Sequence, residues 1–180
     1  MELRRGHAHW TGEAGDPATA RDLYSDLADD HVRIDGPGHP TTLKARHNHA
    51  HWTGEAGNAT AARSLFTALL LDEIRTLGRN HRDTLAAYDH QAKWTGEAGD
   101  PATARSLYSQ LVTDRTRVLG PDHPDTLSTR HQFAHWTGEA GDAAAACDLF
   151  TALLPDRART LGPDHPETLK VRHNQSHWTG

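Results

Sequence analysis

The sequence predicts an all-α protein, an α-solenoid built from stacked antiparallel helical hairpins. Two observations lead to this class: a Trp-Thr-Gly motif returns every 42 residues, and helix-start and helix-stop residues recur at fixed places between its copies. Fixed self-similarity at such a period indicates a solenoid or a propeller, because one unit cannot bury its apolar face until a neighbour stacks on it. A propeller needs strands. No alternating apolar pattern is present between Thr41 and Ala56, so the helical solenoid is favoured.

The repeated motif itself predicts a close contact between neighbouring units. Its tryptophans are Trp10, Trp52, Trp94, Trp136 and Trp178. The glycines that follow are Gly12, Gly54, Gly96, Gly138 and Gly180. A glycine inside a helix costs about 1 kcal/mol relative to alanine, so its presence in every copy indicates that another group approaches the backbone there. We expect the tryptophans to pack between neighbouring hairpins.

The first helix of each unit, helix A, is predicted from about Thr41 to Ala56 in the second copy. Gly57 follows it as a plausible C-terminal stop. A proline before Thr41, Pro40, suits the first turn of this helix, where its missing N–H is not needed. The glycine recurs as Gly15, Gly99 and Gly141, and the proline recurs as Pro124 and Pro166.

The second helix, helix B, starts after a preferred N-cap residue, Asn58 in the second copy and aspartate in the others. It ends at a Leu-Gly pair such as Leu77-Gly78. Apolar residues spaced by three and four predict an amphipathic helix. They are Ala62, Leu65, Phe66, Leu69, Leu70, Ile74 and Leu77.

The 42-residue register predicts a single repeat array over residues 1–180. Its hairpins are predicted at 1–36 (with a truncated start), 37–78, 79–120 and 121–162, followed by an unpaired first helix at 163–180. The chain begins and ends inside a helix A, so we expect a fragment of a larger protein whose last helix could recruit another chain, including a second copy.

Composition narrows the class of partner and the compartment. The formal net charge is −5 with neutral histidines, and acidic and basic residues are interspersed, which disfavours nucleic acid. Cys147 is the single cysteine, so no internal disulfide is possible and a reducing cytoplasm fits. We expect Cys147 to be a small core residue. Neither an apolar export signal nor a run of eighteen apolar residues is present, so no membrane partner is expected.

One segment carries a family resemblance: Leu-Gly-Pro-Asp-His-Pro-Asp-Thr-Leu at 119–127, then Arg130-His131, then Gly-Glu-Ala-Gly-Asp at 138–142. It resembles the 42-residue tetratricopeptide repeats of the kinesin light chain type, abundant in actinobacterial proteins, and the resemblance extends over essentially the whole chain. It implies a right-handed superhelix and partner binding in a concave groove lined by the first helices. It also implies three sets of core positions. These are Ala8, Ala50, Ala92, Ala134 and Ser176 on helix A, Ala20, Ala62, Ala104 and Ala146 on helix B, and the aromatics Tyr24, Phe66, Tyr108 and Phe150.

On helix A, spacing by three and four defines a polar stripe that would line this groove. The predicted groove residues are Arg5, His9 and Glu13, then Lys44, His47, His51 and Glu55, then Asp89, Lys93 and Glu97, then His131, His135 and Glu139, and last Lys170, His173 and His177. Such a surface suits a hydrophilic or charged segment of a protein or peptide partner. Histidines titrate near pH 6.5, so an acidic ligand is expected to bind more tightly below that value.

Other interpretations of the stripe stay open. Histidine pairs at i and i+4, such as His47/His51, could bind a divalent metal with Glu55 as an oxygen ligand. The glutamate of a His-Glu-x-x-His site is missing between the histidines, and Asp89 and Lys93 interrupt the ladder in the third copy, so no metal site is assigned. The stripe could also be an ordinary solvated face, and the array an inert spacer or regulatory arm of a larger signalling or regulatory protein.

Neither catalytic activity nor a bound cofactor is expected. The sequence has neither a Gly-x-x-x-x-Gly-Lys phosphate loop nor a Gly-x-Ser-x-Gly elbow. A repeated sequence presents the same residues again and again, whereas a catalytic pocket needs unlike residues that converge. The sequence therefore predicts a non-enzymatic protein-interaction scaffold.

Overall fold

The computed structural model describes residues 2–178, so Met1, Thr179 and Gly180 lie outside the described residues, including the end of the fifth Trp-Thr-Gly motif. Within this range the chain forms nine α-helices and no strand, which confirms the all-α prediction. Odd-numbered helices are helix A and even-numbered helices are helix B. The helices are α1 (Glu2–Glu13), α2 (Pro17–Asp35), α3 (Pro40–Glu55), α4 (Ala59–Thr76), α5 (Arg82–Glu97), α6 (Pro101–Leu119), α7 (Pro124–Glu139), α8 (Ala143–Leu161) and α9 (Pro166–His177).

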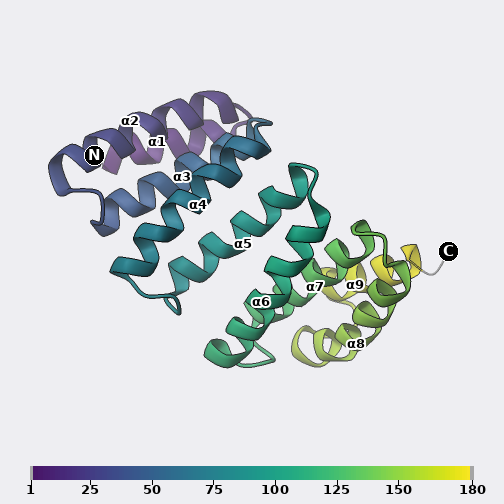
Figure 1. Cartoon of the computed structure of the whole chain (residues 1–180). Helices are drawn as coiled ribbons and strands as arrows, with labels where there is room; N and C mark the ends of the chain where they lie inside the picture. Colours follow the sequence, from purple (N-terminus) through teal and green to yellow (C-terminus); the bar gives the residue numbers. More distant parts are fainter. Residues whose placement is uncertain (1, 179–180) are drawn as a thin grey trace. The chain divides into compact units, whose positions relative to one another are not determined.

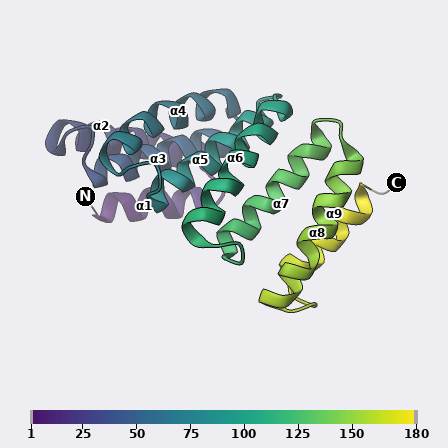
Figure 2. The same cartoon turned by 60° about the horizontal axis from the view of Figure 1, so that its bottom comes forward.

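The helices group into two compact units, one ending at Ala98 and one beginning at Gly99. In the first unit each helix from α1 to α5 packs against the next, and in the second the same holds from α6 to α9. Figures 1 and 2 show that consecutive helices within a unit run in opposite directions. Each unit is therefore a stack of antiparallel hairpins, the arrangement of an α-solenoid.

The turn from helix A to helix B uses the predicted stop and cap. Gly57 has φ +90°, a conformation that a side chain disfavours, and it ends the turn after α3. The Asn58 side chain then accepts a hydrogen bond from the backbone N–H of Ala61 at 3.0 Å. Aspartates take this role at the other three turns, where they accept from the residue three positions on. Each cap satisfies an N–H that the first helical turn leaves free.

Histidines cap the opposite turns, a role that the sequence analysis did not assign to them. The Nδ1 atom of His123 accepts a hydrogen bond from the backbone N–H of Asp125 at 3.1 Å, at the start of α7. The equivalent residues in the other hairpins are His39, His81 and His165, with distances of 3.4, 3.2 and 3.2 Å. These four histidines therefore stabilise helix starts and are not part of the polar stripe.

Small residues allow helices A and B to approach closely. Ala50 on α3 and Ala62 on α4 are both fully buried and lie in one cluster with Phe66, Leu69 and Leu70. The resemblance implied that these positions form the core, and the described copies confirm it, except that Ser176 on α9 is exposed. The corresponding buried residues in other copies are Ala8, Ala20, Tyr24, Ala92, Ala104, Tyr108, Ala134, Ala146 and Phe150.

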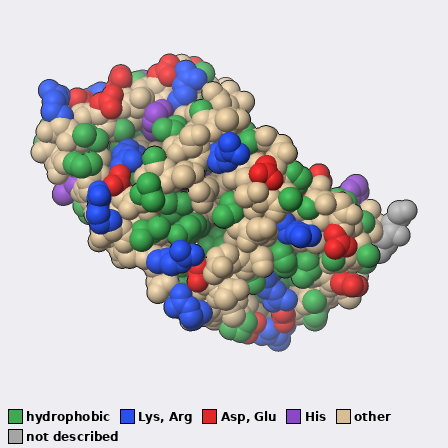
Figure 3. All heavy atoms as spheres, viewed as in Figure 1, with side chains coloured by type: hydrophobic (Ala, Val, Ile, Leu, Met, Phe, Trp, Pro, Cys, Tyr) green, Lys and Arg blue, Asp and Glu red, His purple; other side chains and the backbone are tan. Residues whose placement is uncertain are grey.

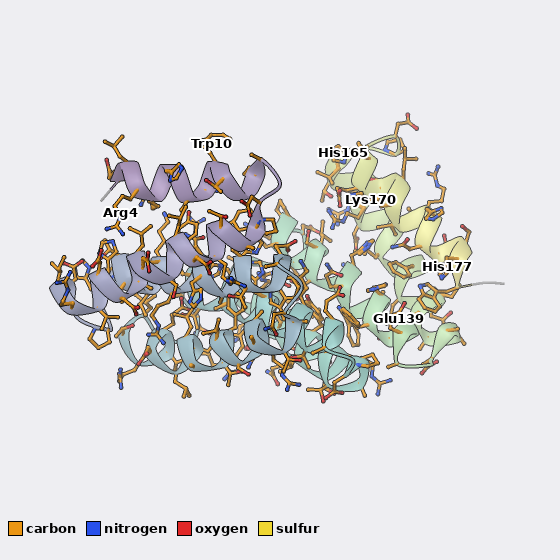
Figure 4. The ribbon with its side chains drawn as sticks, turned by 90° about the horizontal axis from the view of Figure 1, so that it is seen from above. Arg4, Trp10, Glu139, His165, Lys170 and His177 are labelled. Carbon is orange, nitrogen blue, oxygen red and sulfur yellow. The ribbon has the colours of Figure 1, made fainter. Side chains whose placement is uncertain are left out.

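The motif tryptophans join neighbouring hairpins within each unit. The indole of Trp52 lies against Gly12, and that of Trp94 against Gly54, so closely that a Cβ on either glycine would overlap the ring. Trp52 and Trp94 are only 6 % and 5 % exposed. Both the expected close approach and the expected tryptophan packing are thereby confirmed. Trp10 is 70 % exposed, and Figure 4 shows it projecting from α1 on the side away from α2.

A recurrent ion pair also links the two helices of a hairpin. Arg46 on α3 binds Asp72 on α4 at 2.7 Å, and the same pair recurs as Arg4–Asp30 at 2.6 Å and Arg130–Asp156 at 2.7 Å. Arg4 points towards α2 in Figure 4. These partly exposed pairs contribute at most about 1 kcal/mol each, so they favour one hairpin register more than they stabilise the fold.

Two expectations about helix B are wrong. Ile74, predicted on the apolar stripe, is 37 % exposed, whereas its neighbour Glu73 is only 1 % exposed. Cys147 is half-buried, although Ala146 beside it is fully buried. Both differences arise because the buried stripe of a helix is narrow, so that neighbouring positions in the sequence fall on opposite sides of its edge.

Candidate partner groove

The polar stripe predicted on helix A consists of exposed ends and a more buried middle. In the first unit its exposed residues are Arg5, His9, Glu13, Lys44, Glu55 and Glu97, and its half-buried residues are His47, His51, Asp89 and Lys93. In the second unit Glu139, Lys170, His173 and His177 are exposed, and His131 and His135 are half-buried. The exposed face shown in Figure 3 carries hydrophobic, basic and acidic side chains interspersed, with few histidines.

In the first unit the structure brings together stripe residues of three successive A helices. The Nζ atom of Lys93 on α5 lies 2.9 Å from Oε1 of Glu55 on α3. Lys93 also lies 4.1 Å from the ring centre of Trp94, a cation–π contact. The charges of Glu55 and Lys93, and also those of Glu13 and His9 on α1, act on the pKa of His51. These charges act across helices, so the stripes of α1, α3 and α5 lie beside one another.

His47 lies at the buried middle of this stripe and packs among aromatic rings. Its ring centre is 5.1 Å from that of Phe66 on α4 and 5.1 Å from that of His90 on α5. His90 in turn stacks on Phe66 with an interplanar angle of 13°. Burial lowers the pKa of His47 to about 4. The imidazole is therefore neutral at physiological pH.

His131 repeats this arrangement in the second unit. Its ring centre is 5.2 Å from that of Phe150, and the Nδ2 atom of Asn174 lies 3.1 Å from its Nε2. An amide N–H can donate to Nε2 only when that nitrogen carries no proton. Burial, reinforced by the charge of Arg157, lowers the pKa of His131 to about 4. The contact with Asn174 is compatible with this neutral state.

These pKa values correct the expected pH response for the middle of the stripe. The sequence analysis expected histidines that gain charge below pH 6.5, but His47 and His131 remain neutral down to about pH 4 because their rings pack on Phe66 and Phe150. Burial also lowers the pKa of His51. A partner would meet hydrogen-bonding imidazoles at these positions and not cations.

The structure adds residues that the stripe did not include. A pocket of about 430 Å³ lies between α3, α4 and α5, and its lining joins Lys44 and His47 to Glu73 and Asp83. Glu73 belongs to helix B, on which no groove residue was predicted. A signal was present, since its position is polar or charged in each copy of helix B: His31, Glu73, Arg115 and Arg157. His90 was also missed, because it follows the stripe position Asp89 by one residue.

The metal interpretation gains no support from the arrangement of side chains. Within residues 2–178, no three histidine, cysteine, aspartate or glutamate side chains are grouped so as to hold a metal ion. His47 and His51 lie one turn apart, but their neighbour His90 contacts them through T-shaped ring contacts, with ring centres 5.1 and 5.4 Å apart.

Among the described helices, none has the length and apolar character that a membrane span requires.

Comparison with known proteins agrees with this architecture. Residues 84–125 and 126–167 each match the tetratricopeptide repeat family model. Two crystal structures of nearly identical TPR-like repeats from a kinesin light chain-type protein of Podosopora anserina, one of them a single-residue variant, superpose with TM-scores of 0.87 and 0.85. Both are 22 % identical to this chain, and each match covers 98 % of this chain and 84 % of the other.

A third solved structure has the same fold. BtubC (BKLC) from P. vanneervenii superposes with a TM-score of 0.78 at 16 % identity, over 92 % of this chain and 65 % of that one. No curated protein sequence matches the chain significantly. The fold is thus that of an α-solenoid interaction scaffold, a class that is typically non-enzymatic. Residues 84–167 thus match the tetratricopeptide repeat family, in agreement with the resemblance seen in the sequence, and the superpositions show that the chain has the fold of kinesin light chain-like repeats.

Proposed function

We propose that the polar stripe on helix A binds a hydrophilic segment of another protein. The observation that carries this proposal is the proximity of His51, Glu55 and Lys93, which come from α3 and α5, the first helices of two successive hairpins. Charged and hydrogen-bonding groups from several helices, placed side by side, can recognise successive residues of one extended segment. Tetratricopeptide repeats are interaction scaffolds in general, which favours this use of the face.

The chemistry of the stripe defines the kind of segment. Glu13 and Glu55 offer carboxylates, Lys44 offers an ammonium, and neutral His47 can donate or accept a hydrogen bond. Because both signs of charge are present, a segment of mixed charge fits better than a uniformly acidic or an apolar one. The paired state of Lys93 with Glu55 also means that a ligand carboxylate there must compete with an existing ion pair.

Site-specific photo-crosslinking in the producing cells tests this use of the stripe. A photoreactive residue is placed at Lys44 or Glu139, both exposed on helix A, and as matched controls at Asp26 on α2 or Asp148 on α8, both exposed on helix B. We expect the same partner to be captured from both stripe positions and not from the controls. A second copy of the chain would appear as a dimer of defined mass.

The affinity of the captured segment then measures the contribution of the histidines. The double variant His51→Ala/His135→Ala should weaken binding at least about tenfold, which corresponds to the loss of one or two well-made hydrogen bonds. The matched variant Asp26→Asn should bind as the wild type does. Equal crosslinking from helix B, or no capture from any position, would contradict the proposal and favour a spacer role.

A further inference from the structure

The pocket between α3, α4 and α5 differs from the rest of the stripe because it reaches into the hairpin core. Its volume of about 430 Å³ lies within the range of ~300–1,000 Å³ that is usual for small-ligand sites. Leu43 and Ala86 form apolar walls, while Lys44, His47 and Asp83 contribute polar groups. A long side chain with a polar end would match such a lining.

Glu73 lines this pocket and carries an unsatisfied buried group. Its side chain is 1 % exposed, and its Oε2 atom is buried without a hydrogen-bond partner. A buried carboxyl oxygen that lacks a donor is unfavourable, and native structures rarely keep one without a use. Glu73 therefore has an unfilled acceptor and stands in the wall of the pocket.

The charges around Glu73 favour a cation as that ligand. Burial raises its pKa to about 7, and the negative charge of Asp83, at the start of α5, acts in the same direction. The positive charge that opposes this shift is that of Arg46 on α3, which is already bound to Asp72 at 2.7 Å. The chain thus supplies two carboxyl groups to this pocket and commits the neighbouring guanidinium elsewhere.

We propose that this pocket binds a basic side chain of the partner, an arginine guanidinium or a lysine ammonium, whose N–H donates to Oε2 of Glu73. The proposal rests on the proposed function for the origin of the cation. The apolar walls would cover the methylene stem, and the cationic end would meet Glu73 and Asp83. A charge-assisted hydrogen bond of this kind is about twice as strong as a neutral one.

The equivalent residues of the other hairpins support the assignment, because each already has partners within the chain. His31 binds Asp35 at 2.7 Å, Arg115 donates to Thr129 at 2.5 Å, and Arg157 donates to Ser128 at 3.2 Å. Among these four equivalent positions, only Glu73 has a carboxyl group, and its unfilled atom is an acceptor, whereas that of Arg157 is the donor Nε. The pocket of the second hairpin is therefore the one suited to select a basic residue.

Titration of the isotopically labelled full chain with ethylguanidinium chloride, followed by NMR, tests the pocket without a partner. We expect saturable shifts of the Glu73 carboxyl carbon and of Ala86. Glu73→Gln should weaken this binding at least about tenfold, because a neutral amide cannot replace the charged acceptor. The matched ligand is ethylurea, which has a similar shape and no charge, and sodium chloride controls for ionic strength.

The affinity should also rise with pH. The carboxyl pKa near 7 predicts binding about tenfold tighter at pH 8 than at pH 6. The titratable and charged groups that face Glu73 are Lys44, Arg46 and His47 from α3, Asp83 from α5 and His81 before it. A His81→Asn variant, which keeps a good N-cap residue, should retain the pH dependence, and Glu73→Gln should abolish it.

Non-saturable shifts, equal shifts with ethylurea, or unchanged binding in Glu73→Gln would each overturn the proposal. The result is independent of the proposed function. If the stripe variants lose the partner while ethylguanidinium still binds, cation binding by the pocket is confirmed separately from partner binding by the stripe. If the partner binds normally to Glu73→Gln, the pocket does not select a partner side chain.

Discussion

The indole of Trp94 covers the backbone of Gly54, which lies one hairpin earlier in the chain, so closely that a Cβ at position 54 would occupy the space of the ring. The same contact joins Trp52 to Gly12 and Trp178 to Gly138. Each contact links two A helices, and the face on which the candidate groove lies depends on their spacing. The repeated motif is therefore a structural joint between hairpins.

Substitution Gly54→Ala should destabilise the protein by ~1–3 kcal/mol, because the added methyl group forces the buried indole of Trp94 out of its position. Urea unfolding measures the change. The matched control is Gly6→Ala on α1, where a Cβ would meet nothing within 4 Å. That variant should gain up to about 1 kcal/mol from helix propensity.

The same substitution should reverse its sign once the ring is gone. Trp94→Ala alone should cost ~3–5 kcal/mol. In that background, Gly54→Ala should stabilise the chain by up to about 1 kcal/mol, since only helix propensity remains. A loss of stability from Gly54→Ala in both backgrounds would show that the indole is not the obstacle.

Glu73 predicts a loss of stability as the pH rises from acid to neutral. Its pKa is raised from 4.5 to about 7 in the folded chain, so the folded state holds the proton more tightly than the unfolded state does. Stability is therefore lost as the pH rises from about 4.5 to about 7, by up to ~3 kcal/mol. The free energy of unfolding of Glu73→Gln, relative to the wild type, should rise by this amount between pH 4.5 and pH 8. A constant difference would contradict the raised pKa.

His47 predicts the opposite dependence at acid pH. Its pKa falls from 6.5 to about 4 on folding, so the folded state loses stability as the pH falls from about 6.5 to about 4, by up to ~3 kcal/mol. The variant His47→Gln, neutral throughout, should lack this contribution. NMR titration should show the His47 ring unchanged between pH 5.5 and pH 8. Titration near its usual value would indicate that the contact with Phe66 does not bury the imidazole.

The histidine caps can be tested separately from the stripe. His123→Ala should cost ~0.5–2 kcal/mol, because the N–H of Asp125 loses its acceptor at the start of α7. His123→Asn should retain most of the stability, since asparagine is a favourable N-cap. Thermal unfolding of the two variants gives the comparison, and equal losses would argue against a capping role.

Calorimetry with zinc or nickel tests the remaining interpretation of the histidine pairs. We expect no stoichiometric uptake, because the described side chains provide no group of three suitable ligands. Heat of binding that is lost in His47→Gln and retained in His173→Gln would contradict this expectation and place a metal at the middle of the stripe.

Much of the fold could be predicted from the sequence because its signals are local and repeated. The glycine stops, the Asn58 cap and the proline at the start of helix A each act within one turn of the chain, and the structure confirms them. The tryptophan contact was also predictable in kind, since a glycine within a helix needs a reason. Its partner, Gly54 for Trp94, could not be identified without the stacking of hairpins.

The candidate groove could be predicted only in part. Spacing placed Lys44, His47 and His51 on one face. In the structure Lys44 and His47 line one pocket, and His47 and His51 both contact His90. Spacing could not show that His47 would pack on Phe66 and remain neutral, because burial depends on the neighbouring helices. Glu73 was missed for the same reason: it belongs to helix B, whereas the groove was predicted on helix A, and only packing places it beside a pocket.

The sequence by itself determined that this protein is a stack of helical hairpins, since caps, stops and the 42-residue period are encoded within short segments. Tertiary structure alone decided the chemistry of its polar face. The pKa of a histidine or a glutamate depends on the water and the charges around it, and these are set by side chains from other hairpins. In this protein that difference separates the neutral His47 from an exposed histidine, and the unpartnered Glu73 from an ordinary surface carboxylate.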